Sequence, residues 1–388
     1  MKMLLDFEHL FLRFKIFKMK RVSLLLFTIF LTTSVNAQDK IYNLIIGTYT
    51  NSCESKGIYV YDFSVDSGDF SLKATTDNVI NPSYLTVSQG NNFVYSVNEN
   101  GKESSVSSFG FNPKSGKLNF LNSQKTNGAD PCYIINDDKN VISANYSGGN
   151  ITVFGKNTDG SLSEATQIIQ HSGKSANEKR QESAHVHMTY FSPDKKFVLG
   201  NDLGMDKILI YKYDKNAPKD ILTLKETIDT KKGSGPRHLV FSNDGKFVYV
   251  LHELDGSLTA YKYKNGSLKL LQETTIVAKD FKGETSSADV HISPNGKFLY
   301  ATNRGEANTI NTFAISKKGT LDLVNQVDTK GKGPRNFVID PTGKFLLVCH
   351  QYTNDVVIFK IDKTNGKLTD TGKRIELCSP VCLIFTKQ

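Results

Sequence analysis

The sequence lacks several features on which large classes of proteins depend. Almost no stretch of the 388 residues shows helical periodicity over more than two turns, so β-strands are the expected repeated element. The 48 Lys and Arg and 39 Asp and Glu residues are scattered without a block of like sign, which does not indicate a nucleic-acid surface. No G-x-S-x-G, P-loop or H-E-x-x-H motif occurs, so serine-hydrolase, nucleotide-binding and zinc-protease functions lack their residues.

Cysteine is scarce, and the five cysteines contain no C-x-x-C pair. In an oxidising compartment some could form disulfides, but an odd number leaves at least one thiol free. The sequence does not fix the pairing. We expect most of them to be small buried apolar side chains; they are Cys53, Cys132, Cys349, Cys378 and Cys382.

The N-terminal segment has the pattern of a secretory signal. Lys20-Arg21 precedes an apolar run at residues 24–31, and Val35-Asn36-Ala37 supplies a small-residue cleavage site. Met19 is the expected natural start. The run is shorter than the about 18 residues that a membrane span needs, and no Cys follows the cleavage site, so we predict no membrane anchor. The alternative is a buried amphipathic helix.

We therefore predict an N-terminal extension and signal peptide at residues 1–37, with cleavage after Ala37, and a single domain at residues 38–388. The segment 1–37 holds 6 basic and 2 acidic residues, so 48 − 6 = 42 basic and 39 − 2 = 37 acidic residues remain, a net charge of +5. The signal predicts a periplasmic or secreted protein.

One phrase recurs along the chain. It reads PRHLVFSNDGKFVYV from Pro236 and PRNFVIDPTGKFLLV from Pro334, with weaker copies that start at Pro82, Pro131, His185 and Ala288. In each copy an apolar run leads into a turn such as Asn-Asp-Gly, and a second β-rich run, a polar corner and two further strands follow. Four strands per unit, repeated radially, form the blade of a β-propeller.

The spacing of the copies favours seven blades. Equivalent positions at the start of each first strand are 49, 55, 50, 51 and 47 residues apart, near the roughly 40–50 residues of a blade; they are Ser83, Cys132, His187, Arg237, Ala288 and Arg335. The seventh blade is split, because residues 41–75 hold only later strands and residues 379–385 form a lone first strand. Joining the two closes the ring and removes exposed sheet edges. Six or eight blades are the alternatives.

Equivalent positions of the blades converge at the mouths of the central channel. A second ring lies at the corner after each second strand and contains Glu99, Tyr146, Leu203, Glu253, Arg304 and Gln351; just before them stand Asn98, Asn145, Asp202, His252, Asn303 and His350. Several charges in a narrow channel are costly unless they pair or bind a ligand. These residues therefore form either an ion-pair cluster that joins the blades or, as we favour, an anion-binding acid–base site at one mouth.

The residue types suggest individual roles. The planar fork of arginine suits a carboxylate or phosphate, so Arg237, Arg304 and Arg335 could hold such a group or stabilise an oxyanion. His187 and Glu253 are the candidate general acid–base residues.

A metal site needs a separate test, because His185 and His187 alternate on one strand and share a face. A third ligand is not evident, with Asp202 and His291 as the candidates. We predict no metal, with one channel histidine and one that packs.

Together the repeats resemble the lactonase family of seven-bladed propellers, typified by the propeller-type 6-phosphogluconolactonase. The resembling phrases are AHVHMTYFSPD, NDLGMDKILIY, GSGPRHLVFSNDGKFVYVLHEL, ADVHISPNGKFLYATNRGE, GKGPRNFVIDPTGKFLL and the terminal SPVCLIF, and they span nearly all of residues 41–388. The family also contains fungal carboxymuconate-cyclising enzymes that use a His, two Arg and a Glu. By motif these resemble His187, Arg237, Glu253 and Arg304, although many relatives have Asn where this chain has His252.

The resemblance implies hydrolytic opening of a sugar lactone. Glu253 or His187 would act as base, and Arg237 and Arg304 would bind the oxyanion and an anionic substituent. No metal or organic cofactor is required, and we expect a monomer whose partner is the small lactone. Further substrate-binding candidates from the rings are His185, Arg335, Glu99, Asp202, Asn303 and Gln351.

The export signal conflicts with a phosphorylated substrate, since a phosphorylated sugar lactone is a cytoplasmic metabolite. An unphosphorylated aldonolactone is the other expectation. The alternatives are a cyclising isomerase that acts on an unsaturated dicarboxylate and a non-catalytic ligand-binding propeller in the periplasm.

Overall fold

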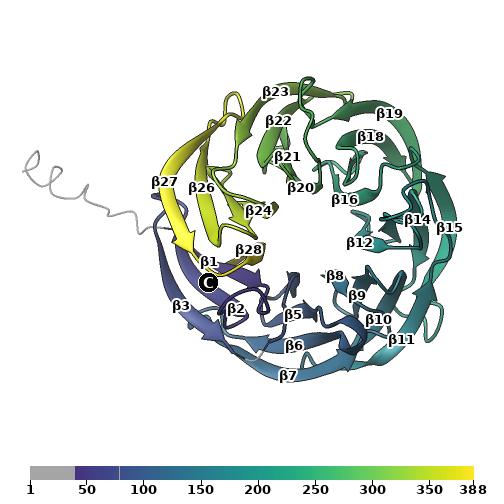
Figure 1. Cartoon of the computed structure of the whole chain (residues 1–388). Helices are drawn as coiled ribbons and strands as arrows, with labels where there is room; N and C mark the ends of the chain where they lie inside the picture. Colours follow the sequence, from purple (N-terminus) through teal and green to yellow (C-terminus); the bar gives the residue numbers. More distant parts are fainter. Residues whose placement is uncertain (1–39, 78) are drawn as a thin grey trace, which may run out of the picture. The chain divides into compact units, whose positions relative to one another are not determined.

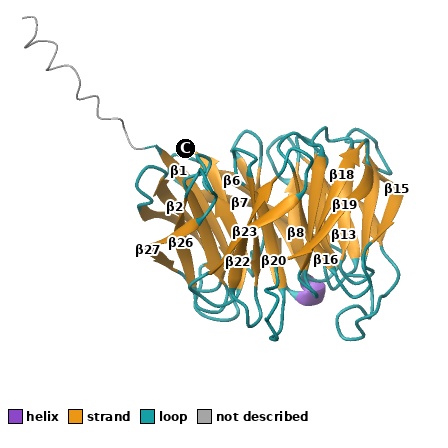
Figure 2. Ribbon diagram, turned by 90° about the horizontal axis from the view of Figure 1, so that it is seen from above, coloured by secondary structure: helices purple, strands orange, loops and turns teal. Residues whose placement is uncertain are grey.

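Seven four-stranded antiparallel sheets surround a common centre (Figure 1). The structure is a computed structural model that describes residues 40–77 and 79–388, so the predicted signal segment lies outside the described residues. Within these ranges no helix is long and apolar enough to cross a membrane. Seen from the side, the strands run between two layers of loops (Figure 2).

Six blades are built from consecutive strands, and the innermost strand of each comes first in the chain. The second to fourth blades contain β4 (Leu85–Val87), β5 (Phe93–Asn98), β6 (Ser105–Phe111) and β7 (Leu118–Lys125); β8 (Pro131–Asn136), β9 (Asn140–Asn145), β10 (Asn150–Lys156) and β11 (Leu162–Gln170); and β12 (Val186–Phe191), β13 (Phe197–Asp202), β14 (Lys207–Tyr213) and β15 (Leu222–Asp229). A short 3-10 helix, η1 (Gly101–Glu103), follows β5.

The fifth to seventh blades contain β16 (Pro236–Phe241), β17 (Phe247–His252), β18 (Ser257–Lys264) and β19 (Ser267–Thr275); β20 (Ser287–Ile292), β21 (Phe298–Asn303), β22 (Thr309–Ile315) and β23 (Leu321–Asp328); and β24 (Pro334–Ile339), β25 (Phe345–His350), β26 (Asp355–Ile361) and β27 (Leu368–Glu376). The first blade combines both ends of the propeller and contains β28 (Pro380–Lys387), β1 (Ile41–Thr48), β2 (Ile58–Ser64) and β3 (Phe70–Thr76).

The closure of the ring confirms the predicted split blade. The C-terminal strand β28 pairs antiparallel with β1, for example Ile384 with Ile45. The predicted count of seven four-stranded blades is likewise confirmed.

The recurring turn phrase, which reads SNDGKF from Ser242, is explained by one tight turn between the first and second strands of a blade. In the fifth blade the Ser242 hydroxyl accepts a hydrogen bond from Phe247 N at 3.0 Å, and Gly245 adopts a φ of 69°. In the fourth blade Lys195 occupies the glycine position with a φ of 53°. This left-handed conformation is strained for a side chain that has a Cβ atom.

The phenylalanine that ends this phrase packs against the next blade. Phe247 covers Gly319, and in the same way Phe197 covers Gly266, so a Cβ atom at either glycine would collide with the ring. The apolar core lies between adjacent blades and consists of buried side chains such as Val250 and Leu299. Each blade therefore depends on its neighbours for the burial of its faces.

A disulfide joins Cys53, in the loop after β1, to Cys378, which lies just before β28. It therefore ties together the two strands at which the ring closes. The other three cysteines are free and buried, as expected of small apolar side chains.

Candidate active site

The innermost strands aim single side chains at one mouth of the propeller because several of them begin with a β-bulge. In the fifth blade the pairing passes from Pro236 to His238 and leaves Arg237 without a partner on β17. In the same way, the strand pairing skips His187 in β12 and Arg335 in β24, so neither residue has a partner on the neighbouring strand. A bulge re-aims the side chain of the extra residue, so the repeat brings a histidine and two arginines to one end of the molecule.

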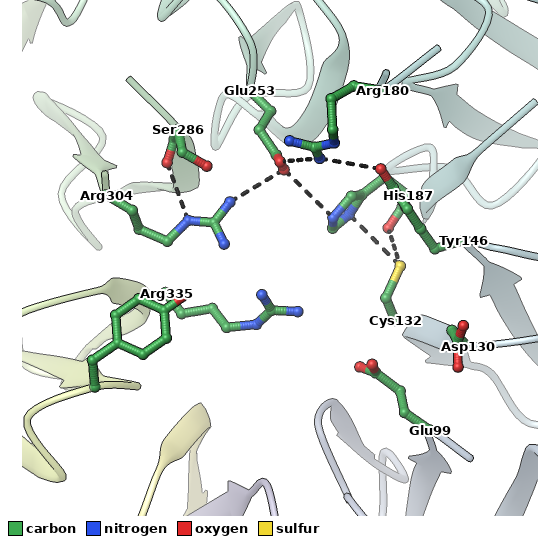
Figure 3. Close-up of a pocket in the computed structure, with 11 residues that line it drawn as sticks. Glu99, Asp130, Cys132, Tyr146, Arg180, His187, Glu253, Ser286, Arg304 and Arg335 are labelled. Atoms are coloured by element: carbon green, nitrogen blue, oxygen red, sulfur yellow. Dashed lines mark hydrogen bonds and ion pairs between the residues drawn. The ribbon is translucent and has the colours of Figure 1, made fainter. Parts of the chain in front are cut away.

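Glu253, which follows β17, accepts hydrogen bonds from Arg237 and Arg180 and forms an ion pair with Arg304. Its carboxylate lies 2.8 Å from Arg237 Nε, 2.6 Å from Arg180 Nη2 and 3.2 Å from Arg304 Nη2. The Nε2 atom of His187 lies 3.9 Å away (Figure 3). Glu253 is therefore the centre of a cluster that joins residues from three blades and one long loop.

The electrostatics of this cluster keep Glu253 ionised. Burial alone would raise its pKa, but the guanidinium groups of Arg304, Arg237 and Arg180 outweigh burial and lower the pKa to about 2. A carboxylate held in this way is a weak base at neutral pH, since an effective general base has a pKa near the working pH.

Arg237 stands behind Glu253 and is only 2% exposed. Its Nη1 atom donates to Nε2 of His238 at 3.1 Å and to the carbonyl oxygen of Ala288, and Nδ1 of His238 lies 2.7 Å from Asp289 Oδ1. Burial, and then Arg237, lowers the pKa of His238 to about 4, so this imidazole is neutral and can accept from Arg237 while it donates to Asp289. The chain from Asp289 through His238 fixes the guanidinium that orients Glu253.

His187 lies between Glu253 and a thiol. Its Nδ1 atom is 3.7 Å from Cys132 Sγ. Burial, followed by the positive charges of Arg237 and its neighbours, lowers the pKa of His187 well below its ordinary value. The imidazole is therefore neutral at pH 7, and adding a proton to it is unfavourable.

A cavity of about 380 Å³ opens beside this cluster, and its lining is Glu99, Asp130, Cys132, Tyr146, Arg180, His187, Glu253, Ser286, Arg304, Arg335 and Tyr352. Figure 3 shows the guanidinium of Arg335 projecting into the space between Glu253 and Glu99. Arg335 forms no ion pair with any residue in the ranges 40–77 and 79–388. Its Nη2 atom donates to the Tyr49 hydroxyl at 2.8 Å.

Comparison with known proteins places this geometry in a family. The model of the seven-bladed β-propeller lactonase family matches residues 43–385. The chain belongs to this family. It is 36% identical to the 6-phosphogluconolactonase of Formosa agariphila over 84% of this chain and 94% of that protein, and 34% identical to the 6-phosphogluconolactonase of Bacillus subtilis over 88% and 98%.

A solved structure is also similar to this lactonase-family chain. The periplasmic gluconolactonase PpgL of Pseudomonas aeruginosa is 33% identical, covers 89% of this chain and 99% of its own, and superposes with a TM-score of 0.85. The family and the fold that the repeats predict are therefore confirmed.

The structure brings together five of the ten predicted site residues in the lining of the cavity of this lactonase-family protein, namely His187, Glu253, Arg304, Arg335 and Glu99. It does not bring Arg237 there. We expected Arg237 to bind an oxyanion, but its guanidinium is used by Glu253, His238 and a carbonyl group. The catalytic role of Arg237 therefore stays a prediction.

Four further predicted substrate-binding residues lie outside the cavity lining. Asp202 accepts from His185 N at 2.9 Å and lies 2.7 Å from His171 Nδ1, so it joins the two ends of the connection between β11 and β12. The ring of His185 stacks on Tyr146 at 4.5 Å, and its nitrogens lie near the Tyr146 carbonyl oxygen and Glu182.

The last two of these four residues are Asn303 and Gln351. Asn303 ends its strand and turns its side chain toward the backbone, where Oδ1 accepts from Ser286 N at 3.0 Å. The backbone N–H of Gln351 donates to Gly333 O. The side-chain Oε1 atom of Gln351 is buried without a hydrogen-bond partner in the described part of the chain. Residues at a strand end alternate between the channel and the loops, so ring position alone does not decide which way a side chain points.

The pair His185 and His187 has separate partners, so the two imidazoles do not converge on one point. In the part of the chain that the structure describes, no group of three His, Cys, Asp or Glu side chains is arranged to hold a metal ion.

Sequence reasoning missed Arg180, Asp130, Ser286 and Tyr352. Arg180 comes from the long connection between β11 and β12, and its side chain is 42% exposed while it reaches Glu253 and the Tyr146 hydroxyl. The 55-residue interval between Cys132 and His187 marks this insertion in the sequence. The other three stand in loops outside the aligned repeat positions, where no such signal exists.

Proposed function

We propose that this protein hydrolyses the ester bond of a sugar lactone, with an unphosphorylated aldonolactone as the preferred substrate. The observation that carries the proposal is the cavity. In it Arg335, which forms no ion pair in the described ranges, lies with Arg304, the neutral imidazole of His187 and three carboxylates. Membership of the lactonase family supports the reaction class.

The arginines suit the charge that develops in this reaction. When water adds to the carbonyl carbon of a lactone, negative charge forms on the carbonyl oxygen, and fixed guanidinium donors stabilise it. Arg335 forms no ion pair in the described ranges, and only the more distant charges of Glu99 and Glu253 act on it. Arg304 is fixed by the carbonyl oxygens of Ser286 and Ser287 at 3.1 and 3.3 Å. Glu253, which Arg237 orients, forms an ion pair with the Arg304 guanidinium at 3.2 Å and lies 3.9 Å from the imidazole of His187.

The charge balance of the cavity supports an uncharged substrate. Three arginines in the lining, Arg180, Arg304 and Arg335, face three acidic residues, Glu99, Asp130 and Glu253, and Arg237 behind the lining adds one positive charge. A phosphate dianion would bring two negative charges into this nearly balanced cavity, whereas a neutral lactone brings none. The near balance of positive and negative side chains in the cavity also argues against a cyclising isomerase that acts on an unsaturated dicarboxylate.

The test is release of acid from glucono-δ-lactone and from 6-phosphogluconolactone by the purified protein of residues 38–388, followed in a pH-stat. We expect faster opening than in buffer for both lactones, with the higher kcat/KM for glucono-δ-lactone. A higher kcat/KM for the phosphorylated lactone would overturn the substrate choice. Opening of neither lactone above the rate in buffer would overturn the hydrolase and leave a binding protein.

We further propose that the chain is exported and loses residues 1–37. The signal pattern in the sequence, the disulfide between Cys53 and Cys378 and the periplasmic location named for the Pseudomonas aeruginosa relative all support this. Fractionation of cells that express the full chain should place a protein that begins at Gln38 outside the cytoplasm. A cytoplasmic protein that retains residues 19–37 would contradict export.

A further inference from the structure

We infer that Glu99 is the general base of this site and takes the proton from the attacking water, while Glu253 serves to hold the arginines. The inference rests on the proposed lactone hydrolysis and adds a catalytic residue to it. It differs from the expectation drawn from the sequence, in which Glu253 or His187 is the base and Glu99 only binds substrate.

The groups that donate hydrogen bonds to Glu99 are hydroxyls, and the positive charge of Arg335 acts on it without forming an ion pair. The Tyr49 hydroxyl lies 3.0 and 3.2 Å from its two carboxylate oxygens, and the Ser83 hydroxyl donates to Oε1. No Lys, Arg or His of the described chain forms an ion pair with it. Glu99 is thus held in place, but its charge is not neutralised as that of Glu253 is.

The groups that face Glu99 come from four blades. Tyr49 follows β1, Ser83 precedes β4, Asp130 and Cys132 lie at the start of β8, and Arg335 lies in β24. Burial raises the pKa of Glu99, and Asp130 adds to this, while Arg335 and the two hydroxyl groups act in the opposite direction; the pKa remains above its ordinary value.

The three candidate bases differ in what a proton would do to each. A proton on Glu253 would break ion pairs with three arginines, and a proton on His187 would place a cation beside Arg237 and Arg335. A proton on Glu99 would remove a charge that burial disfavours. Two carboxylates whose environments push their pKa values in opposite directions are the usual sign of a division of roles in an active site.

The geometry also places Glu99 next to the expected position of the carbonyl group. The Tyr49 hydroxyl contacts both Glu99 and Arg335, with an Nη2–O distance of 2.8 Å to the latter. Figure 3 shows Glu99 and Glu253 on opposite sides of the cavity, with the Arg335 guanidinium extended between them. A lactone carbonyl bound to Arg335 therefore has Glu99 on one side, where a water molecule can be held.

The reaction then balances as a hydrolysis. Glu99 accepts a proton from water while the water oxygen bonds to the carbonyl carbon, and the carbonyl electron pair moves to the oxygen held by Arg335. The tetrahedral intermediate collapses, the ring C–O bond breaks, and the leaving ring oxygen takes the proton from Glu99. One lactone and one water give one hydroxy acid, which ionises in solution and supplies the acid that a pH-stat records.

The test compares Glu99→Gln with the matched control Glu103→Gln, which changes an exposed glutamate four residues away. We expect E99Q to lower kcat by about 10²–10⁴-fold with KM changed by less than about threefold, and E103Q to behave as wild type. Formate should restore part of the activity of E99A, which a merely structural role would not allow. An E99Q variant with wild-type kcat, or an E99A variant that formate does not restore, would overturn the assignment while the wild-type activity upholds the hydrolase.

A second variant serves if E99Q does not fold. Tyr49→Phe removes a hydroxyl that stabilises the charged form of Glu99, so the pKa of Glu99 should rise. The acidic limb of the kcat/KM profile should then move to higher pH. An unmoved limb would show that another group is the base. A wild-type protein that opens neither lactone would overturn the proposed function and this assignment together.

Discussion

Replacing Glu253 with Gln would remove the charge at the centre of the arginine cluster and keep the size of the side chain. The pKa of Glu253 is about 2 in the folded protein, against an ordinary value of 4.5. This difference of about 2.5 pH units corresponds to about 3 kcal/mol of stability at neutral pH, at about 1.4 kcal/mol per unit. Because the side chain is only 6% exposed, solvent screens the interaction little. We expect E253Q to lower the free energy of unfolding by about 3 kcal/mol at pH 7.

The effect should depend on pH in a defined direction. The folded pKa lies below the unfolded one, so the contribution of Glu253 is complete above about pH 5 and is lost as the pH falls toward 2. Wild type and E253Q should therefore differ most at pH 7 and converge toward pH 2–3.

Urea unfolding measures the free energy of unfolding of wild type and E253Q at each pH. The transition is followed by circular dichroism or by the fluorescence of the 16 tyrosines, because the chain has no tryptophan. Glu103→Gln, at an exposed glutamate, is the control and should match wild type. A difference between wild type and E253Q below about 1 kcal/mol, or one that is equal at pH 7 and pH 3, would refute the view that three ion pairs outweigh the burial of Glu253.

Three further predictions concern the scaffold. Lys195→Gly should raise the free energy of unfolding by about 0.5–1 kcal/mol, because it relieves a left-handed conformation; a urea melt that shows destabilisation would contradict this. Cys53→Ser should cost about 2–4 kcal/mol, because it removes the disulfide to Cys378 at the closure of the ring, and a reductant should destabilise wild type equally but leave the variant unchanged. Asp289→Asn should cost about 3 kcal/mol, because it deprives the buried His238 and the partly exposed His291 of their carboxylate; a urea midpoint equal to that of wild type would contradict it.

The sequence predicts the fold well because each repeat carries its own physical signals. The turn that Ser242 and Gly245 build is local, and its residues recur at the blade interval. The closing strand was predictable because residues 41–75 lack a first strand and the C-terminal tail supplies one. The disulfide was not predictable, because two cysteines 325 residues apart meet only once the ring has closed.

The site was predictable in position but not in detail. Repeat phase identifies the residues that reach one mouth, and the β-bulges that aim Arg237 and Arg335 occupy the same phase. The phase does not show that Arg237 contacts Glu253 outside the cavity lining, nor that Arg180 enters from an insertion. The pKa difference between Glu99 and Glu253 depends on which neighbours contact each carboxylate, and that information exists only in three dimensions.

The most direct test of the account is the effect of Arg335→Ala on lactone opening, with Lys332→Ala, at an exposed residue in the loop just before β24, as the control. If the unpaired guanidinium stabilises the oxyanion, R335A should lower kcat/KM for glucono-δ-lactone by about 10²–10³-fold, and K332A should leave it unchanged. Both variants should fold as the wild type does, by circular dichroism. An R335A protein that opens the lactone at the wild-type rate would contradict the claim that this cavity is where the reaction takes place.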